Sequence, residues 1–309
     1  MNDLYLNLVN SGFGARIARA LGLPMPVFLE RHRDGDPVIN GVVLVGGGGN
    51  PELQKALALT FKSMATRTMA HAGLPQWITT ANEAGLTVGN WVDADQQSGG
   101  KLKGLVFDAT GIEDSTQSDS LYQFFHDAAR SVLPCGRVVV LGRPPEPCNN
   151  PKKATIQRAL EGLTRSLGKE LGRAITVQLV YVAEGAENQI ESTLRFLLSP
   201  RSAYVSGQVI RITPQIGSHP DSVDWVRPLS GKKVLVTGAS RGIGAAIAEV
   251  MVRDGALVTC LDVPQAQAAL DEIAVKLDCR VIALDIGAAE APQQLVDAAR
   301  ARRVGRYCT

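Results

Sequence analysis

Short apolar runs alternate with amphipathic stretches along most of the chain. Between the runs, apolar residues recur every three or four positions, the spacing of helices that bury one face. Strands that alternate with helices predict a parallel, doubly wound α/β sheet. The expected strands lie at 42–45, 105–111, 136–142, 175–181 and 207–212, and the expected helices at 51–65, 121–133, 152–171 and 190–198.

Less regular segments surround this pattern. Residues 1–40 predict a short helix at 15–21 and a mixed, helical stretch at 28–34. Pro51 suits the first position of the helix that follows the strand at 42–45. Tyr122, Phe124 and Phe125 are expected in the core, and 67–100 is a variable middle with turn signals.

Residues 214–230 predict a linker, because Pro214, Gly217, Pro220 and Pro228 stand among scattered polar residues. The expected domains are therefore 1–213 and 231–309. The second opens on an apolar strand at 233–236, glycines at 238, 242 and 244, and a helix from Ala245.

A strand, a glycine turn and a helix can bind a pyrophosphate, since backbone approaches the ligand at the glycines and the helix start offers unpaired N–H groups. Asp262 ends a second strand, 257–261, and Asp285 ends a third, 280–284. An acid at the first of these places can accept hydrogen bonds from ribose hydroxyls. The alternative is that both aspartates merely end strands.

The segment Thr237-Gly-Ala-Ser-Arg-Gly-Ile-Gly244 resembles the cofactor turn of the short-chain dehydrogenase/reductase family. The resemblance implies a nicotinamide cofactor. Asp262 favours NADH over NADPH, because its charge would repel a 2′-phosphate, although an arginine placed like Arg241 often helps to hold one. The implied cofactor contacts are Gly238, Ser240, Arg241, Gly242, Ile243, Gly244, Asp262 and Asp285.

Residues 101–212 resemble the C-terminal half of the same family, but without its catalytic groups. Arg143, Lys153 and Gln157 stand at the positions of the family's Ser, Tyr and Lys. We therefore name no catalytic residue. The glycines at 46–49 predict a plain strand–helix turn; the alternative is a phosphate cradle, and a flavin there has little support because hydroxyl side chains are lacking.

The order of the whole chain resembles the high-molecular-weight 3-oxoacyl-acyl-carrier-protein reductases of fatty acid metabolism, which join a flavodoxin-like domain to a reductase domain. The resemblance implies NADH-dependent reduction of a 3-oxoacyl thioester by the full-length relative. Residues 231–309 lack the catalytic half and end in a basic tail, which predicts a truncated or frameshifted product; a natural short form is the alternative. The fold expected is thus a Rossmann/flavodoxin-like domain followed by a partial second Rossmann unit.

A different class of function remains open, a non-catalytic nucleotide-binding or oligomerisation module. The apolar face of 156–171 supports it, since such helices often pair between subunits in the family, and we expect a homo-oligomer. In the partial unit, Val234–Val236 would form an exposed apolar edge, because the strands that normally flank it on one side are missing.

Charge and composition exclude some classes of binding partner. A net charge of +2 gives no reason to expect nucleic acid. No apolar run approaches the ~20 residues of a membrane-spanning helix, and the N-terminus lacks a signal peptide's basic region. The five cysteines show no CxxC spacing and predict free thiols in a reducing cytoplasm, with no metal site.

Overall fold

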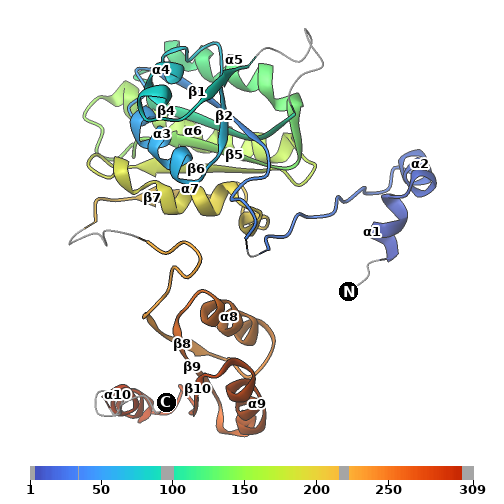
Figure 1. Cartoon of the computed structure of the whole chain (residues 1–309), viewed down its shortest axis with the longest axis vertical. Coiled ribbons are helices and arrows are strands. Elements are labelled where there is room, and N and C mark those ends of the chain that lie inside the picture. The colour runs from blue at the N-terminus through green and yellow to red at the C-terminus, as the bar shows by residue number, and fades with distance from the viewer. Residues whose placement is uncertain (1–3, 34, 92–100, 216–222, 301–309) are drawn as a thin grey trace. The chain divides into compact units, whose positions relative to one another are not determined.

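A computed structural model describes residues 4–33, 35–91, 101–215 and 223–300. Compactness divides the chain into two units, Met1–Ser218 and His219–Thr309. Part of the expected linker, 216–222, and the basic tail, 301–309, lie outside the described residues. Figure 1 shows the helices and strands of both units.

Unit 1 contains a seven-stranded parallel sheet in the order β3-β2-β1-β4-β5-β6-β7. From the central strand β1, the chain adds β2 and β3 on one side and then β4 to β7 on the other. This is the strand order of a Rossmann sheet, 3-2-1-4-5-6, and differs from the flavodoxin order 2-1-3-4-5. The expected doubly wound fold class is confirmed. The strands are β1 Val42–Gly49, β2 Arg67–Ala70, β3 Val88–Asn90, β4 Leu102–Gly111, β5 Val132–Gly142, β6 Thr176–Val182 and β7 Val209–Ile212.

Helices cover both faces of this sheet because side chains alternate along each strand. Val43 and Val45 of β1 pack against α3 (Gln54–Ser63), α4 (Gln76–Glu83) and α7 (Glu191–Leu198). Leu44 faces the opposite core, which α5 (Asp119–Ala128) and α6 (Pro151–Glu170) enclose. Among the described helices, none is long and apolar enough to cross a membrane.

Several local predictions for unit 1 were wrong. Helix α3 begins at Gln54, so Pro51 precedes it, and residues 28–33 form no helix. The variable middle contains β2, α4 and β3, whose short apolar pieces gave no long periodic pattern. Tyr122 is 61% exposed, although its neighbours Phe124 and Phe125 are buried as expected.

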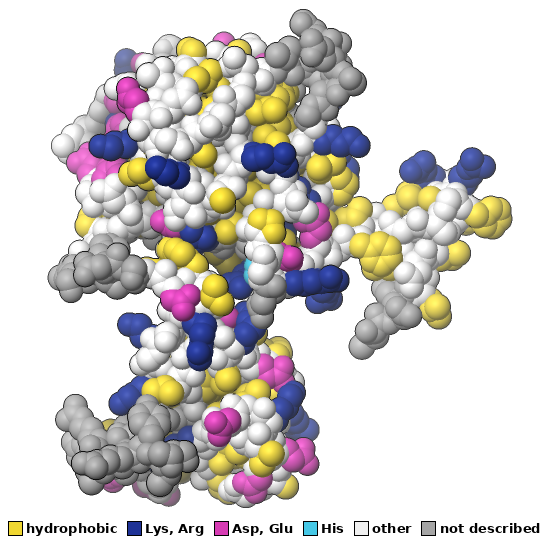
Figure 2. Space-filling view, viewed as in Figure 1, with side chains coloured by type: hydrophobic (Ala, Val, Ile, Leu, Met, Phe, Trp, Pro, Cys, Tyr) yellow, Lys and Arg dark blue, Asp and Glu magenta, His cyan; other side chains and the backbone are white. Residues whose placement is uncertain are grey.

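The chain begins with a helical hairpin, α1 (Leu4–Val9) and α2 (Gly12–Ala20). Val9 and Ala18 are buried in it, whereas Leu4, Phe13 and Leu21 are largely exposed. Figure 2 shows hydrophobic and basic side chains gathered on these helices. The hairpin's own core is therefore very small.

Unit 2 contains three parallel strands in the order β10-β9-β8. Helices α8 (Gly242–Arg253) and α9 (Gln267–Leu277) share one core with Val236, Val258 and Cys260, and α10 (Ala291–Arg300) packs on the other face, near Leu261 and Leu284. The strands are β8 Lys233–Thr237, β9 Leu257–Asp262 and β10 Arg280–Ala283.

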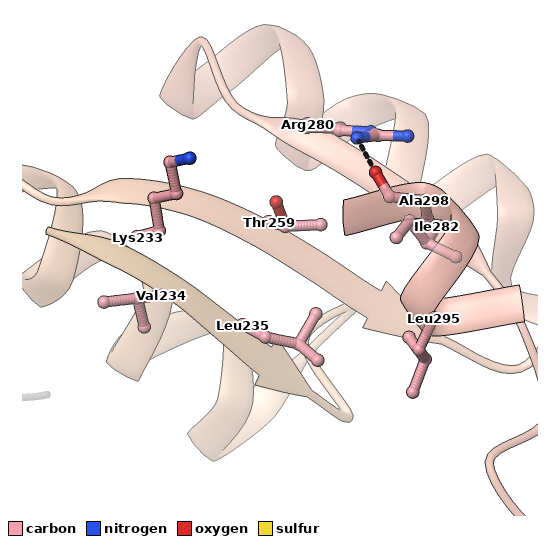
Figure 3. A pocket seen from close by; sticks show the side chains of 8 residues that line it. All are labelled: Lys233, Val234, Leu235, Thr259, Arg280, Ile282, Leu295 and Ala298. Atoms are coloured by element: carbon pink, nitrogen blue, oxygen red, sulfur yellow. Dashed lines mark hydrogen bonds between the residues drawn. The ribbon is translucent and has the colours of Figure 1, made fainter. Parts of the chain in front are cut away.

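Strand β8 is an edge of this described sheet, as expected from the sequence. Leu235 is 46% exposed there, and a hollow of about 190 Å³ opens beside it. Figure 3 shows side chains of β8, β9, β10 and α10 around this hollow, with Arg280 donating to the Ala298 carbonyl at 3.0 Å. Among the described residues, part of an apolar face of this sheet is thus exposed.

Candidate cofactor site

The turn between β8 and α8 is built by three glycines with two different roles. Gly238 and Gly242 have φ of +64° and +60°, a region that side-chain-bearing residues rarely adopt. A Cβ on either would meet no described atom within 4 Å, so both glycines face open space. At Gly244 a Cβ would lie 2.1 Å from the Gly238 carbonyl oxygen, so this glycine lets the helix approach the turn.

The start of α8 is free of internal capping in the described structure. Arg241 is the N-cap residue, its backbone is extended, and its side chain makes no capping hydrogen bond. Arg241 is exposed, and the Ile243 side chain is 82% exposed. The first N–H groups of the helix and its positive dipole end therefore face the same open space as the glycines.

Asp262 is held directly beside this turn. Its carboxylate accepts hydrogen bonds from the backbone N–H groups of Ser240, at 3.0 Å, and Val263, at 2.9 Å. Hydrogen bonding from Ser240, first by its side chain and then by its N–H, lowers the pKa of Asp262, and the N–H of Val263 adds to this effect. An ionised carboxylate has about four acceptor positions, so Asp262 retains acceptor capacity for ligand hydroxyls.

Asp285 does not join this arrangement. It follows β10, and β9 lies between β10 and the glycine-bearing strand. Its side chain accepts a hydrogen bond from the N–H of Gly287 at 2.8 Å, which shapes the loop after the strand. Of the eight residues expected to contact a cofactor, seven thus share one corner of unit 2, and Asp285 stands apart.

The corresponding turn of unit 1 is filled by the protein itself. A Cβ at Gly46 would lie 2.3 Å from Phe124, and one at Gly48 would lie 2.3 Å from the Ser120 hydroxyl. The N–H of Leu53, just before α3, donates to the buried carboxylate of Asp108 at 2.8 Å. The start of α3 thus already has an acceptor within the chain, which favours the interpretation of 46–49 as a plain strand–helix turn.

Asp108 takes the place of an anionic ligand in unit 1. It also accepts hydrogen bonds from the N–H of Thr110 at 3.0 Å and from its hydroxyl at 2.6 Å. Burial raises the pKa of Asp108, while the bonds from Thr110 and Leu53 oppose that rise. This role was not predicted; its only signal in the sequence is the Asp-x-Thr pattern at the end of a buried strand.

The positions that resemble the family's catalytic groups form a structural network. The buried Gln157 side chain accepts from the N–H of Arg143 at 2.8 Å and donates to the carbonyls of Ala109 and Ile112. Arg143 pairs with Glu52 and Glu187, and Lys153 pairs with Glu113 at 2.7 Å. Each of the three positions is thus engaged by partners within unit 1.

The comparison with protein families bears on unit 2. Residues 232–306 match the model of the short chain dehydrogenase family, which covers about a quarter of the chain. A search of curated proteins found no match. The similarity to that family thus applies to the segment that carries the glycine turn and Asp262.

Solved structures of similar fold have low identity. A short-chain dehydrogenase/reductase mutant from Serratia marcescens is 18% identical, with 57% of this chain and 98% of that one covered and a TM-score of 0.45. A dehydrogenase/reductase from Sinorhizobium meliloti is 15% identical, with 57% and 95% covered and a TM-score of 0.45. BdcA from E. coli is 22% identical, with 57% and 100% covered and a TM-score of 0.43. Likeness at this level carries no functional argument.

Proposed function

We propose that unit 2 binds the ADP-ribose part of a nicotinamide dinucleotide, with NADH favoured over NADPH. Gly238, Gly242 and Gly244 would let the pyrophosphate approach the start of α8, with Ser240, Arg241 and Ile243 beside it. Asp262 would accept hydrogen bonds from the ribose hydroxyls, and Asp285 would make a weaker, more distant contribution. The observation that supports this most is the open glycine turn with an ionised aspartate fixed beside it.

The wider proposal concerns the full-length relative, an NAD-dependent short-chain reductase of 3-oxoacyl thioesters. A bound NADH would supply the hydride for such a reduction. This chain contributes a degenerate first domain, 1–213, a linker, 214–230, and the cofactor half-site in 231–309. The partners that Arg143, Gln157 and Lys153 have within unit 1 support a structural or regulatory role for that domain.

A fluorescence titration of the purified 309-residue chain with NADH tests the binding proposal. We expect saturable binding that weakens about tenfold in Asp262→Ala, the worth of ~1.4 kcal/mol. Asp271→Ala is the matched control, because Asp271 is an exposed acid on α9 that bonds only to Gln267 among the contacts described. No binding, or equal weakening in both variants, would remove the proposal.

A second candidate function is oligomerisation through α5 and α6. An apolar groove of about 470 Å³ lies between these helices, lined chiefly by Leu121, Tyr122, Phe125, Leu160, Leu163 and Leu167. The exposed Tyr122 side chain favours this reading over a purely internal core. Light scattering would test it: Leu163→Glu should yield monomers, whereas Arg165→Glu, on the outer side of α6, should not.

A further inference from the structure

Unit 2 contains a pair of thiols in direct contact, outside the cofactor turn. The Sγ atoms of Cys260 and Cys279 are 3.6 Å apart. Both are free thiols; Cys260 is buried and Cys279 is partly exposed. Two sulfurs at this distance need only a small movement to reach the ~2.05 Å of a disulfide bond.

Local structure fixes both cysteines in place. Cys260 lies within β9, where Val281 of β10 is its register partner. Cys279 follows the end of α9, where Asp278 adopts the left-handed conformation (φ +47°, ψ +53°). The N–H of Cys279 then donates to the Ala274 carbonyl at 3.2 Å. The contact therefore follows from a helix cap and a strand pairing, rather than from two long flexible loops.

We propose that Cys260 and Cys279 are a redox modification site that forms an intramolecular disulfide when the chain meets a hydroperoxide. The Cys279 thiolate attacks the peroxide oxygen, breaks the O–O bond and becomes a sulfenic acid, releasing an alcohol or water. The Cys260 sulfur then attacks the sulfenic sulfur, and the displaced hydroxide leaves as water with the Cys260 proton. Two thiols are oxidised and one peroxide is reduced.

The environment assigns the order of these steps. Cys279 is the accessible partner, so the oxidant reaches it first. Burial raises the pKa of Cys260 to about 12, which keeps that thiol protonated and unreactive toward a bulk oxidant. Its nearness to the sulfenic acid, rather than its acidity, is what makes it the resolving group.

The disulfide would brace the strand that carries the cofactor aspartate. Cys260 stands two residues before Asp262 on β9, and Cys279 stands directly before β10. The bond would close a loop between positions 260 and 279, which restricts the unfolded chain. Oxidation should therefore raise the unfolding temperature of unit 2, whose described sheet has three strands and whose hydrophobic cores are small.

Peptide mapping of the full chain tests the proposal. After brief treatment with hydrogen peroxide, trypsin should release the peptides 254–276 and 277–280 as one disulfide-linked species, which dithiothreitol separates. The oxidised chain should lose two free thiols and two mass units, and its unit 2 transition should rise by about 5 °C or more. Cys279→Ser should abolish the crosslink, the loss of thiols and mass, and the rise in the unfolding temperature. Cys260→Ser should leave Cys279 as a sulfenic or sulfinic acid.

Cys148→Ser is the matched control, because Cys148 is also partly buried and bonds to a backbone carbonyl, that of Pro144. It should leave the crosslink unchanged. Overoxidation of Cys279 in the unmodified chain, a bond between Cys279 and another cysteine, or a crosslink between chains would overturn the proposal. None of these outcomes depends on nucleotide binding, so this experiment and the NADH titration test two independent proposals.

Discussion

The turns β1–α3 and β8–α8 begin from the same pattern of strand, glycines and helix, and differ in what occupies the space beside the glycines. In unit 1, Phe124 and Ser120 fill that space, and Asp108 accepts the N–H of Leu53 at the helix start. In unit 2 the glycines face open space, and Asp262 stands at the rim of the turn.

The two turns differ in the burial of the carboxyl group that accepts their backbone N–H groups. A helix start attracts an anion, and a buried carboxylate of the same chain can satisfy it as well as a phosphate can. Asp108 is fully buried and belongs to the fold, whereas Asp262 is partly exposed and has acceptor positions to spare. Glycine spacing alone therefore identifies a turn, and the neighbouring strand decides whether a ligand can use it.

The largest effect should come from removing the internal anion. Asp108→Ala leaves the buried N–H of Leu53 without its acceptor, and we expect a loss of about 3 kcal/mol in the unfolding free energy of unit 1. Urea unfolding measures it. The control is Asp114→Ala: Asp114 makes the same Asp-x-Thr contacts with Thr116 on the surface, so its loss should be barely measurable. Equal effects would show that burial does not matter here.

Gly244→Ala should destabilise unit 2 by about 2 kcal/mol, because the added Cβ would meet the Gly238 carbonyl oxygen and push α8 from the turn. Gly162→Ala is the matched control, since that helical glycine in α6 has nothing within 4 Å of an added Cβ. It should leave stability unchanged or raise it slightly. Thermal unfolding of both variants separates the outcomes, and a harmless Gly244→Ala would refute the close approach.

Asp262→Asn should sharpen the cofactor comparison. Without the carboxylate charge, NADPH should gain about tenfold in affinity relative to NADH, since repulsion of the 2′-phosphate is lost (~1.4 kcal/mol). The positive charge of Arg241 should contribute to this gain in NADPH affinity by attracting the 2′-phosphate. The double variant Asp262→Asn/Arg241→Ala should therefore show a smaller change in the ratio of NADPH to NADH affinity. Competition titrations with both nucleotides measure the ratio. An unchanged ratio would mean that the ribose end binds elsewhere.

The smallest effect concerns pH. Because the folded pKa of Asp262 is lowered, its ionised form stabilises unit 2 above its ordinary pKa near 3.8, and this contribution disappears as pH falls through the folded value. The stability difference between the chain and Asp262→Asn should thus be present at pH 7 and vanish in strong acid. Urea unfolding midpoints across this range check the sign; a difference that grows on acidification would contradict it.

Periodicity predicted most of the fold, because long elements with one buried face leave a clear pattern. Helix α6 was expected at 152–171 and lies at Pro151–Glu170. The short elements β2, α4 and β3 were not predicted, because they are too brief to give a periodic signal. Their structure depends on burial against the rest of the fold. Tyr122 was placed in the core because it neighbours Phe124, yet its direction from α5 leaves it exposed.

The parallel α/β class, the glycine turn of unit 2 and the aspartate at the end of the next strand could all be predicted from the amino-acid sequence alone. These features are short sequence motifs. The parallel pairing of β8 with β9 then places the glycine turn and the aspartate at the same end of the sheet. Tertiary structure decided the rest: that Asp108 fills the first turn, that Gln157 and Arg143 bind each other, and that Cys260 meets Cys279. Such contacts join residues far apart in the chain, so they exist only once the sheet and its helices have packed.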